Sequence, residues 1–240
     1  IGLELGVIGC FNIQYAIKKD ELFVLEVNPR GSRTFPFVAK STGIPLARIA
    51  ARLTMGDLLS DLNIPERQEE AVAVKAPVFP FIKLRGLDPA PGPEMKSTGE
   101  VMGSHKNAAA AYLKARMATE IPVPTHGGVY ITVKDSDKES IISLAKSLKD
   151  MEFDLYATRG TAAVLRERGG LEVNSAYRIA EQGSPDALDL MRDGKIQLII
   201  NTPTNSGGAV LDGNMMRRLA VELNIPFVTT MSGATMEVQA

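Results

Sequence analysis

The first part of the chain alternates between apolar and polar residues with a period of two. Residues 11–18 show this alternation first, and it returns over residues 22–28 after a short charged stretch. A period of two is typical of strands, so we predict a hairpin that turns about Asp20. In its second strand we expect one face to carry Phe23, Leu25 and Val27, and the opposite face to carry Leu22, Val24, Glu26 and Asn28.

Farther along, the spacing of apolar residues becomes that of helices. Residues 44–59 predict an amphipathic helix with Pro45 in its first turn. Frequent prolines over residues 64–93 predict an extended connector that packs on neighbouring protein. The alanine-rich residues 107–118 predict a short helix, and the prolines within residues 121–124 then mark a domain boundary.

From residue 127 onward, short apolar runs alternate with helical segments. Strands are predicted over residues 129–133, 154–158, 196–201 and 226–230. Helices are predicted over residues 138–151, 162–168, 185–192, 212–223 and the C-terminal end. This order predicts an α/β fold with a parallel sheet covered by helices, in which ligands bind outside the carboxyl ends of the strands.

Composition narrows the class of protein. A chain of 240 residues with 45% hydrophobic residues can bury a sizeable core. The balance of 27 basic and 28 acidic residues does not favour nucleic acid or an anionic membrane as a partner, and small ligands are expected instead. The single cysteine, Cys10, excludes an internal disulfide and fits a cytoplasmic protein. No apolar run approaches the roughly 20 residues of a membrane span, and because Ile1 is not an initiator residue we expect a fragment.

Polar side chains converge on one face of the predicted hairpin. A turn about Asp20 places Gln14 opposite Glu26 and Asn12 opposite Asn28. One carboxylate together with amide oxygens suits Mg²⁺, which prefers hard oxygen ligands. The same spacing is equally compatible with a solvated hairpin face that has no ligand.

Two arginines, Arg30 and Arg33, follow the end of the second predicted strand. Their guanidinium groups could neutralise phosphoryl oxygens beside a bound metal, which would fit phosphoryl transfer. The alternative is a pair of solvated arginines after an Asn-Pro turn.

A second group of polar residues lies at the carboxyl ends of the predicted C-terminal strands. The hydroxyls of Thr158 and Thr161 lie between a strand and a helix, where backbone N–H groups suit a phosphate. Lys138 begins a helix, and Asn201 and Thr202 end a strand, so the fold would bring all of them to one sheet edge. Alternatively, Thr161 caps a helix, Lys138 is solvated and Asn201 forms a turn.

Several stretches resemble one enzyme family. Residues 12–14 and 25–30 resemble the last catalytic subdomain of ATP-grasp ligases. With residues 33–38, residues 50–52 and the string over residues 92–103, essentially the whole chain resembles the carbamoyl phosphate synthetase large subunit. The resemblance implies a C-terminal part of an ATP-grasp domain over residues 1–64, a connector packed on it over residues 65–124, and a methylglyoxal synthase-like allosteric domain over residues 125–240.

By this resemblance, Gln14, Glu26 and Asn28 are ligands of Mg²⁺ or Mn²⁺, while Arg30 and Arg33 contact phosphate and substrate. The implied enzyme is an ATP-dependent, glutamine-hydrolysing ligase that phosphorylates carbamate to carbamoyl phosphate for pyrimidine and arginine synthesis. Its implied partner is a glutamine amidotransferase small subunit, and a homo-oligomer is compatible with the family. Most of the ATP site would lie outside this chain, so we expect the chain alone to be inactive.

The resemblance of the C-terminal domain implies a nucleotide effector such as uridine monophosphate (UMP). The implied effector-binding residues are Lys138, Thr158, Gly160, Thr161, Arg178, Asn201 and Thr202. Pro203 stands where the family often has a second hydroxyl, and residues 204–208 form an unusual glycine-rich loop, so the nucleotide stays open. Two alternative functions also stay open: a lyase acting on dihydroxyacetone phosphate, with Asp186 or Asp189 as its carboxylate, and a nucleotide-binding module without catalysis.

Overall fold

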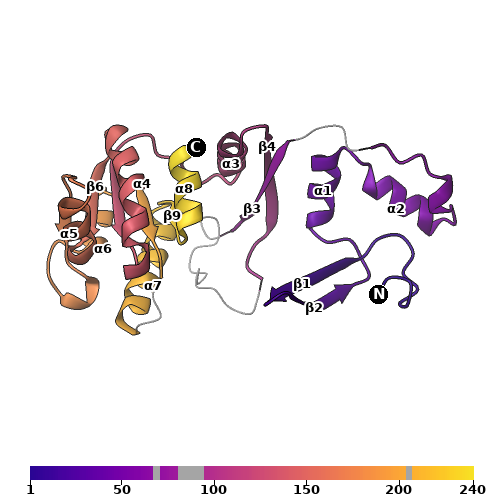
Figure 1. Ribbon diagram of the computed structural model, residues 1–240, viewed down its shortest axis with the longest axis horizontal. Helices are drawn as coiled ribbons and strands as arrows, with labels where there is room; N and C mark the ends of the chain where they lie inside the picture. Colours follow the sequence, from indigo (N-terminus) through magenta and orange to yellow (C-terminus); the bar gives the residue numbers. More distant parts are fainter. Residues whose placement is uncertain (67–70, 81–94, 204–206) are drawn as a thin grey trace.

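A computed structural model describes residues 1–66, 71–80, 95–203 and 207–240 of the chain. In these residues the strands form three separate sheets, which follow one another along the long axis of the molecule (Figure 1). A hairpin with two helices lies at one end, a two-stranded sheet with one helix lies in the middle, and a five-stranded sheet lies at the other end.

The N-terminal hairpin consists of β1, Asn12–Lys18, and β2, Glu21–Asn28, which pair antiparallel. Its turn residues Lys19 and Asp20 have φ angles of 49° and 64°. Two-residue hairpin turns require such left-handed angles because their twist then matches that of the strands. The predicted hairpin and the position of its turn are therefore confirmed.

A β-bulge divides this hairpin into two halves. Gln14 pairs with Glu26, but the next residue of β1, Tyr15, pairs with Val24, so Leu25 is an extra residue in β2. An extra residue shifts the alternation of its strand by one position. The prediction that Val24 shares a face with Glu26 is therefore wrong, because the period-two pattern cannot detect the bulge.

Two helices follow the hairpin: α1, Thr34–Thr42, and α2, Leu46–Thr54. α2 lies within the predicted helix over residues 44–59 but ends five residues earlier. α1 is absent from the predicted elements. Its Pro36 lies in the first turn, where proline is tolerated, and the helix ends at Gly43, whose φ of 73° is the left-handed conformation common after a helix end.

The middle of the chain forms a two-stranded antiparallel sheet that is covered by one helix. β3, Val72–Val78, confirms the extended stretch expected in the connector, whereas β4, Gly99–His105, is not among the predicted elements. α3, Ala108–Met117, confirms the alanine-rich helix, and the Asn107 side chain caps it by accepting a backbone N–H at 3.0 Å. Phe81, also expected to be extended, lies outside the described residues.

Gly103 allows α3 to lie directly on β4. A Cβ atom at this position would come within 2.0 Å of the carbonyl oxygen of Ala111 and 2.5 Å of the amide nitrogen of Ala115. Both alanines are almost completely buried. Small residues on the two sides of this contact therefore let the helix backbone approach the strand closely.

The C-terminal domain is built on a parallel sheet with the strand order β7-β6-β5-β8-β9. Its strands are β5, Gly128–Thr132; β6, Asp154–Thr158; β7, Asn174–Ala176; β8, Leu198–Asn201; and β9, Phe227–Val228. The order runs outward from β5 in both directions, so the carboxyl ends of β5 and its neighbours surround the topological switch point. The predicted α/β fold with a parallel sheet is confirmed, and β7 is an additional strand.

Helices cover both faces of this sheet (Figure 1). They are α4, Lys138–Asp150; α5, Arg159–Glu167; α6, Ala187–Arg192; α7, Gly207–Glu222; and α8, Met231–Gln239. Residues of α4, α5 and α8 join one apolar cluster, and residues of α6 and α7 join the other. Along β8, Leu198 and Ile200 face the first cluster while Ile199 faces the second, which explains the uninterrupted apolar run of a strand buried on both sides.

Short 3-10 turns complete the described structure at Leu59–Asp61, Asp135–Asp137 and Ile179–Glu181. Among the helices that the described residues form, none combines the length and the apolar character that crossing a lipid bilayer requires.

Candidate functional site

The predicted metal-binding side chains lie together on the polar face of the hairpin. The strand pairing places Gln14 opposite Glu26 and Asn12 opposite Asn28, as predicted. Nδ2 of Asn28 donates a hydrogen bond to Oε1 of Glu26 at 3.0 Å. The register is therefore confirmed, while the metal-binding role of these residues stays a prediction.

The oxygen atoms on this face fit a hard divalent cation. The hydrogen bond between Asn28 and Glu26 uses one carboxylate oxygen and one amide N–H, so the second carboxylate oxygen and the Asn28 amide oxygen remain for a ligand. Across the part of the chain that the structure describes, no group of three or more His, Cys, Asp or Glu side chains comes together as a metal site. Because Glu26 is the single carboxylate here, anionic ligand oxygens such as those of a phosphate would have to complete the coordination.

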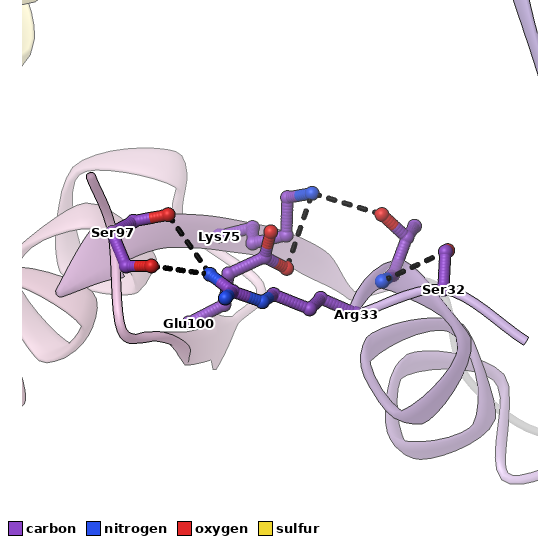
Figure 2. Close-up of polar contacts among 6 residues, drawn as sticks. Ser32, Arg33, Lys75, Ser97 and Glu100 are labelled. Carbon is purple, nitrogen blue, oxygen red and sulfur yellow. Dashed lines mark hydrogen bonds and ion pairs between the residues drawn. The ribbon is translucent and has the colours of Figure 1, made fainter. Parts of the chain in front are cut away.

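Arg30 and Arg33 lie beyond the end of β2 and use their guanidinium groups differently. Nη1 of Arg30 donates to the neighbouring carbonyl oxygen of Gly31 at 3.1 Å. Nη1 of Arg33 instead reaches Ser97, just before β4, and donates to its carbonyl oxygen at 2.8 Å and its hydroxyl oxygen at 2.9 Å (Figure 2). Arg33 thus connects the region after the hairpin to the middle sheet, and the catalytic roles of both arginines stay predictions.

All the predicted effector-binding residues line one cavity at the carboxyl ends of β5, β6 and β8. They are Lys138, Thr158, Gly160, Thr161, Arg178, Asn201 and Thr202. The cavity therefore lies at the switch point of the sheet, where doubly wound folds bind their ligands. Residues 204–206, part of the glycine-rich loop noted in the sequence, lie outside the described residues.

The first turn of α5 forms a polar wall of this cavity. Thr158 donates its hydroxyl hydrogen to the hydroxyl oxygen of Thr161 at 3.3 Å, and Thr161 is 1% exposed. Because α5 already begins at Arg159, Thr161 lies within its first turn, and the alternative that Thr161 caps the helix is wrong.

The ammonium group of Lys138 lies beside this first turn. A Cβ atom on Gly160 would be 3.4 Å from Nζ of Lys138, and the same Nζ forms an ion pair with Oδ1 of Asp135 at 2.7 Å. The hydrogen bond from Lys138 lowers the pKa of the Asp135 carboxyl group. A cation next to free helix N–H groups is an arrangement that suits a phosphate, which would compete with Asp135 for Lys138.

Asn201 supplies the cavity with an unpaired acceptor. Its Nδ2 donates to the carbonyl oxygen of Thr132 at 3.3 Å, while its Oδ1 is buried without a partner among the described residues. Leaving a buried acceptor unpaired costs about 1–3 kcal/mol, so a donor on a bound ligand or a water molecule would stabilise this site. Beside it, the Thr202 hydroxyl oxygen accepts the backbone N–H of Lys134 at 3.0 Å.

The cavity also has an apolar and acidic side that the sequence reasoning missed. This side includes Tyr130, Asp212 and Met216. Burial raises the pKa of the Asp212 carboxyl group and also raises the pKa of the Tyr130 hydroxyl. The sequence does place Tyr130 in a strand and Asp212 at a helix start, but no local pattern shows that the two elements meet over the same cavity.

The carboxylates that kept the lyase alternative open have a structural role. Oδ1 of Asp186 accepts the backbone N–H of Asp189 at 2.9 Å, and Oδ2 of Asp189 accepts the backbone N–H of Asp186 at 3.2 Å. Oδ2 of Asp189 also accepts the Ser184 hydroxyl at 3.0 Å. These reciprocal bonds form the N-terminal cap of α6, which accounts for both carboxylates without a catalytic function.

A buried ion pair joins the C-terminal domain to the middle of the chain. Glu237 of α8 accepts from Nε and Nη2 of Arg116 at 3.0 and 3.1 Å, and from the Tyr112 hydroxyl at 2.6 Å. The side chain of Glu237 is 3% exposed, and that of Arg116 is 13% exposed. α3 and α8 are therefore held together by a charged group that water scarcely reaches.

Two protein families match separate parts of the sequence. Residues 1–62 match the family described as carbamoyl-phosphate synthase L chain, ATP binding domain. Residues 140–229 match the family described as MGS-like domain. The two matches follow one another in the order expected from the sequence motifs.

Curated proteins match the chain over nearly its whole length. The carbamoyl phosphate synthase large chain of Methanothermobacter thermautotrophicus is 49% identical over 238 residues, which cover 98% of this chain and 22% of that protein. The carbamoyl phosphate synthase large chain, C-terminal section, of Methanocaldococcus jannaschii is 44% identical, and the alignment covers 40% of that protein. The corresponding section from Methanopyrus kandleri is 45% identical, and the alignment covers 44% of it. This chain therefore spans less than half the length of each of these relatives. A solved methylglyoxal synthase from Elizabethkingia anophelis is 17% identical, with a TM-score of 0.42, over 49% of this chain and 80% of that protein.

Proposed function

Because the chain belongs to the carbamoyl phosphate synthase large-chain family, in which it corresponds to the C-terminal section, we propose that it carries part of a carbamate-phosphorylating site and a nucleotide-sensing domain. The observation that supports the first half most directly is the hairpin register, which gathers Gln14, Glu26 and Asn28 on one face ahead of the arginines. The proposed reaction transfers a phosphoryl group from ATP to carbamate, with the remainder of the ATP site on other parts of the large chain.

The residues of this chain would bind and orient the charged groups of that reaction. Gln14, Glu26 and Asn28 would hold Mg²⁺ or Mn²⁺, which supplies charge neutralisation for phosphate oxygens when bound. Arg30 and Arg33 would contact the phosphoryl and carbamate oxygens, because a guanidinium group can donate two parallel hydrogen bonds to an oxyanion. Neither step requires a covalent intermediate on the protein.

The cavity of the C-terminal domain would bind a nucleoside monophosphate such as UMP. Lys138, the first turn of α5 and the Thr158 and Thr161 hydroxyls would hold its phosphate. The unpaired Oδ1 of Asn201 needs a hydrogen-bond donor, which the hydroxyl groups of a ribose could supply. This requirement supports a ribonucleotide as the effector.

An unbroken series of contacts connects the cavity to the hairpin region. α4, which begins with Lys138, packs in the same core cluster as α8, and α8 holds α3 through Glu237. α3 packs on β4, and Ser97, two residues before the start of that strand, bonds Arg33. The effector would regulate phosphorylation if these contacts have two alternative arrangements and the effector binds one arrangement more tightly than the other. The quantity to measure is the coupling free energy between the effector cavity and the phosphorylation site.

The wider assignments follow from the family and are proposals as well. We infer that the full large chain works with a glutamine amidotransferase small subunit, serves pyrimidine and arginine synthesis, and resides in the cytoplasm. A homo-oligomer is compatible with these assignments.

Titration calorimetry of this chain tests the ligand class of the cavity. UMP, inosine monophosphate, dihydroxyacetone phosphate and inorganic phosphate should be compared for the unmodified chain and for Lys138→Ala. We expect a nucleotide to bind best and Lys138→Ala to weaken it by about tenfold or more, since a charge-assisted hydrogen bond is lost. Lys146→Ala, on an exposed position of the same helix, is the control that should leave binding unchanged. Preference for dihydroxyacetone phosphate with release of methylglyoxal would contradict the proposal.

Substitution in the full-length large chain tests the catalytic half. Glu26→Gln should reduce carbamate-dependent ADP formation by about 100-fold or more, because the single carboxylate of the proposed metal site is removed. Glu21→Gln changes another glutamate of the same strand, at its far end opposite Lys18, and should have little effect. Retained activity in Glu26→Gln would remove Glu26 from the proposed metal site.

A further inference from the structure

Arg33 is held at a junction between two parts of the chain that are distant in sequence. It directly precedes α1, and its two acceptors both belong to Ser97, which lies 64 positions further along the chain. Figure 2 shows the guanidinium group reaching across to the carbonyl and hydroxyl oxygens of Ser97. The backbone on the Arg33 side is also tied down, because the hydroxyl oxygen of Ser32 accepts the N–H of Thr34 at 3.2 Å.

The two hydrogen bonds to Ser97 use only one end of the guanidinium group. Both are donated by Nη1, and among the described residues no acceptor is recorded for Nε or Nη2 of Arg33. Nε and Nη2 form the side of a guanidinium group that binds carboxylate or phosphate oxygens in a bidentate manner. Ser97 therefore restrains Arg33 without occupying the edge that recognises an oxyanion.

A second polar bridge lies beside the first and connects the same two regions. Nζ of Lys75 in β3 donates to the Thr34 hydroxyl oxygen at 3.0 Å and forms an ion pair with Glu100 of β4 at 3.2 Å (Figure 2). The side chains of Lys75 and Glu100 are 34% and 21% exposed. Each strand of the middle sheet thus contributes to fixing the residues at the start of α1.

From this geometry we propose that Ser97 is a positioning residue for the phosphoryl-transfer site: it anchors Nη1 of Arg33 and leaves the Nε and Nη2 edge to the oxyanion of the substrate. This inference rests on the proposed function, in which Arg33 contacts the carbamate or its phosphoryl product. A free arginine side chain has many rotamers, and anchoring one end removes most of them before the substrate arrives. The middle sheet is then a part of the catalytic apparatus, because it sets the direction of Arg33.

The experiment measures the full-length large chain in both directions of the proposed reaction. ADP formation from ATP and carbamate gives the forward rate, and ATP formation from ADP and carbamoyl phosphate gives the reverse rate. We expect Ser97→Ala to lower kcat/KM for carbamoyl phosphate by about tenfold, the loss of one hydrogen bond to a charged group, with most of the change in KM. Ser97→Thr keeps the hydroxyl and should restore kcat/KM to within about twofold.

Two controls separate positioning from a general loss of structure. Thr98→Ala removes the neighbouring hydroxyl, which donates within the middle sheet to the carbonyl oxygen of Val78 at 3.3 Å, and it should leave kcat/KM unchanged. In an Arg33→Lys background, Ser97→Ala should cause no additional loss, because the guanidinium group that it anchors is already gone. If Ser97→Ala fails to fold, Ser97→Cys, which is close to serine in size, replaces it in the same set of single and double variants with Arg33→Lys.

The possible results distinguish this inference from the proposed function itself. If Arg33→Lys is impaired but Ser97→Ala matches the unmodified enzyme, the positioning role is wrong while the role of Arg33 stands. If the losses in the double variant simply add, Ser97 acts independently of Arg33 and the inference is again overturned. If Arg33→Lys retains full activity, the proposed catalytic role of Arg33 is wrong, and the positioning role of Ser97 that rests on it is wrong as well.

Discussion

The two ends of this molecule differ in how far their apolar residues are buried. Among residues 1–66, all of which the structure describes, none is buried, and Ile17 and Leu22 of the hairpin are 76% and 63% exposed. In the C-terminal domain, Ile141 and Ile200 are 0% exposed and belong to one contiguous core. The C-terminal domain therefore buries its own hydrophobic residues, whereas the hairpin presents an apolar face of the kind that packs against another protein surface.

The polar contacts on the two sides of the middle sheet also differ in how far they are buried. Towards the C-terminal domain, the sheet's helix is joined through Glu237, whose side chain is 3% exposed. Towards the hairpin, the bonds from Arg33 and Lys75 lie in a more open environment. Charged contacts are worth more where water is excluded, so we expect the middle sheet to be stabilised mainly by the C-terminal domain.

Truncation of one buried and one exposed isoleucine gives the largest expected difference between the ends. Ile141→Ala should reduce the free energy of unfolding of the C-terminal domain by about 2–5 kcal/mol, because it removes apolar contacts and leaves a cavity. Ile17→Ala should change stability by less than about 0.5 kcal/mol, as is usual for exposed positions. Amide hydrogen exchange resolved by peptide would report each region separately. Equal losses at both sites would show that the apolar hairpin face is covered in solution.

Two glycines of one strand sharpen the comparison within the middle sheet. Gly103→Ala should destabilise the chain by about 1–3 kcal/mol, because the new Cβ would overlap the backbone of α3. Gly99→Ala is the matched control, since a Cβ there would meet nothing within 4 Å. Urea unfolding of both variants gives the comparison, and similar midpoints would mean that α3 does not lie on β4 as the structure has it.

The smallest expected effect concerns the tyrosine at the buried junction. Burial first, and then the hydrogen bond to Glu237, raise the pKa of the Tyr112 hydroxyl above its ordinary value. Because the folded-state pKa is raised, the stabilising contribution is fully present below about pH 10 and is lost as pH rises beyond that value. Tyr112→Phe should therefore lose less stability between neutral and strongly alkaline pH than the unmodified chain does. Tyr130, whose pKa is also raised by burial, is present in both chains, so both lose stability at alkaline pH and the difference between them reports Tyr112.

Much of the C-terminal fold could be predicted because its local signals agree with its tertiary environment. Strands such as Leu198–Asn201 are buried on both faces, so their apolar runs are uninterrupted and easily recognised. β4 was missed because its sequence, with two glycines, two polar residues and a histidine, has no apolar run. Its existence depends on pairing with β3 and on the helix that lies against Gly103.

In the candidate sites, too, features with a local sequence signal could be predicted and features that depend on tertiary contacts could not. The facing of Gln14 and Glu26 could be predicted, because a short turn determines the register of the strands that it joins. The contact between Arg33 and Ser97 could not, since it joins residues separated by α1, α2 and β3. Asp212 also escaped prediction, because a single acid within a helix does not reveal which cavity that helix faces.

The sequence by itself determined the order of the elements, the hairpin turn and the set of polar residues at the carboxyl ends of the parallel strands. These features depend on periodicity, turn residues and connectivity, all of which are local. Only the tertiary structure decided the bulge at Leu25, the close approach of α3 to Gly103 and the anchoring of Arg33 by Ser97. Each of these depends on contacts between segments whose distance in space no local pattern encodes.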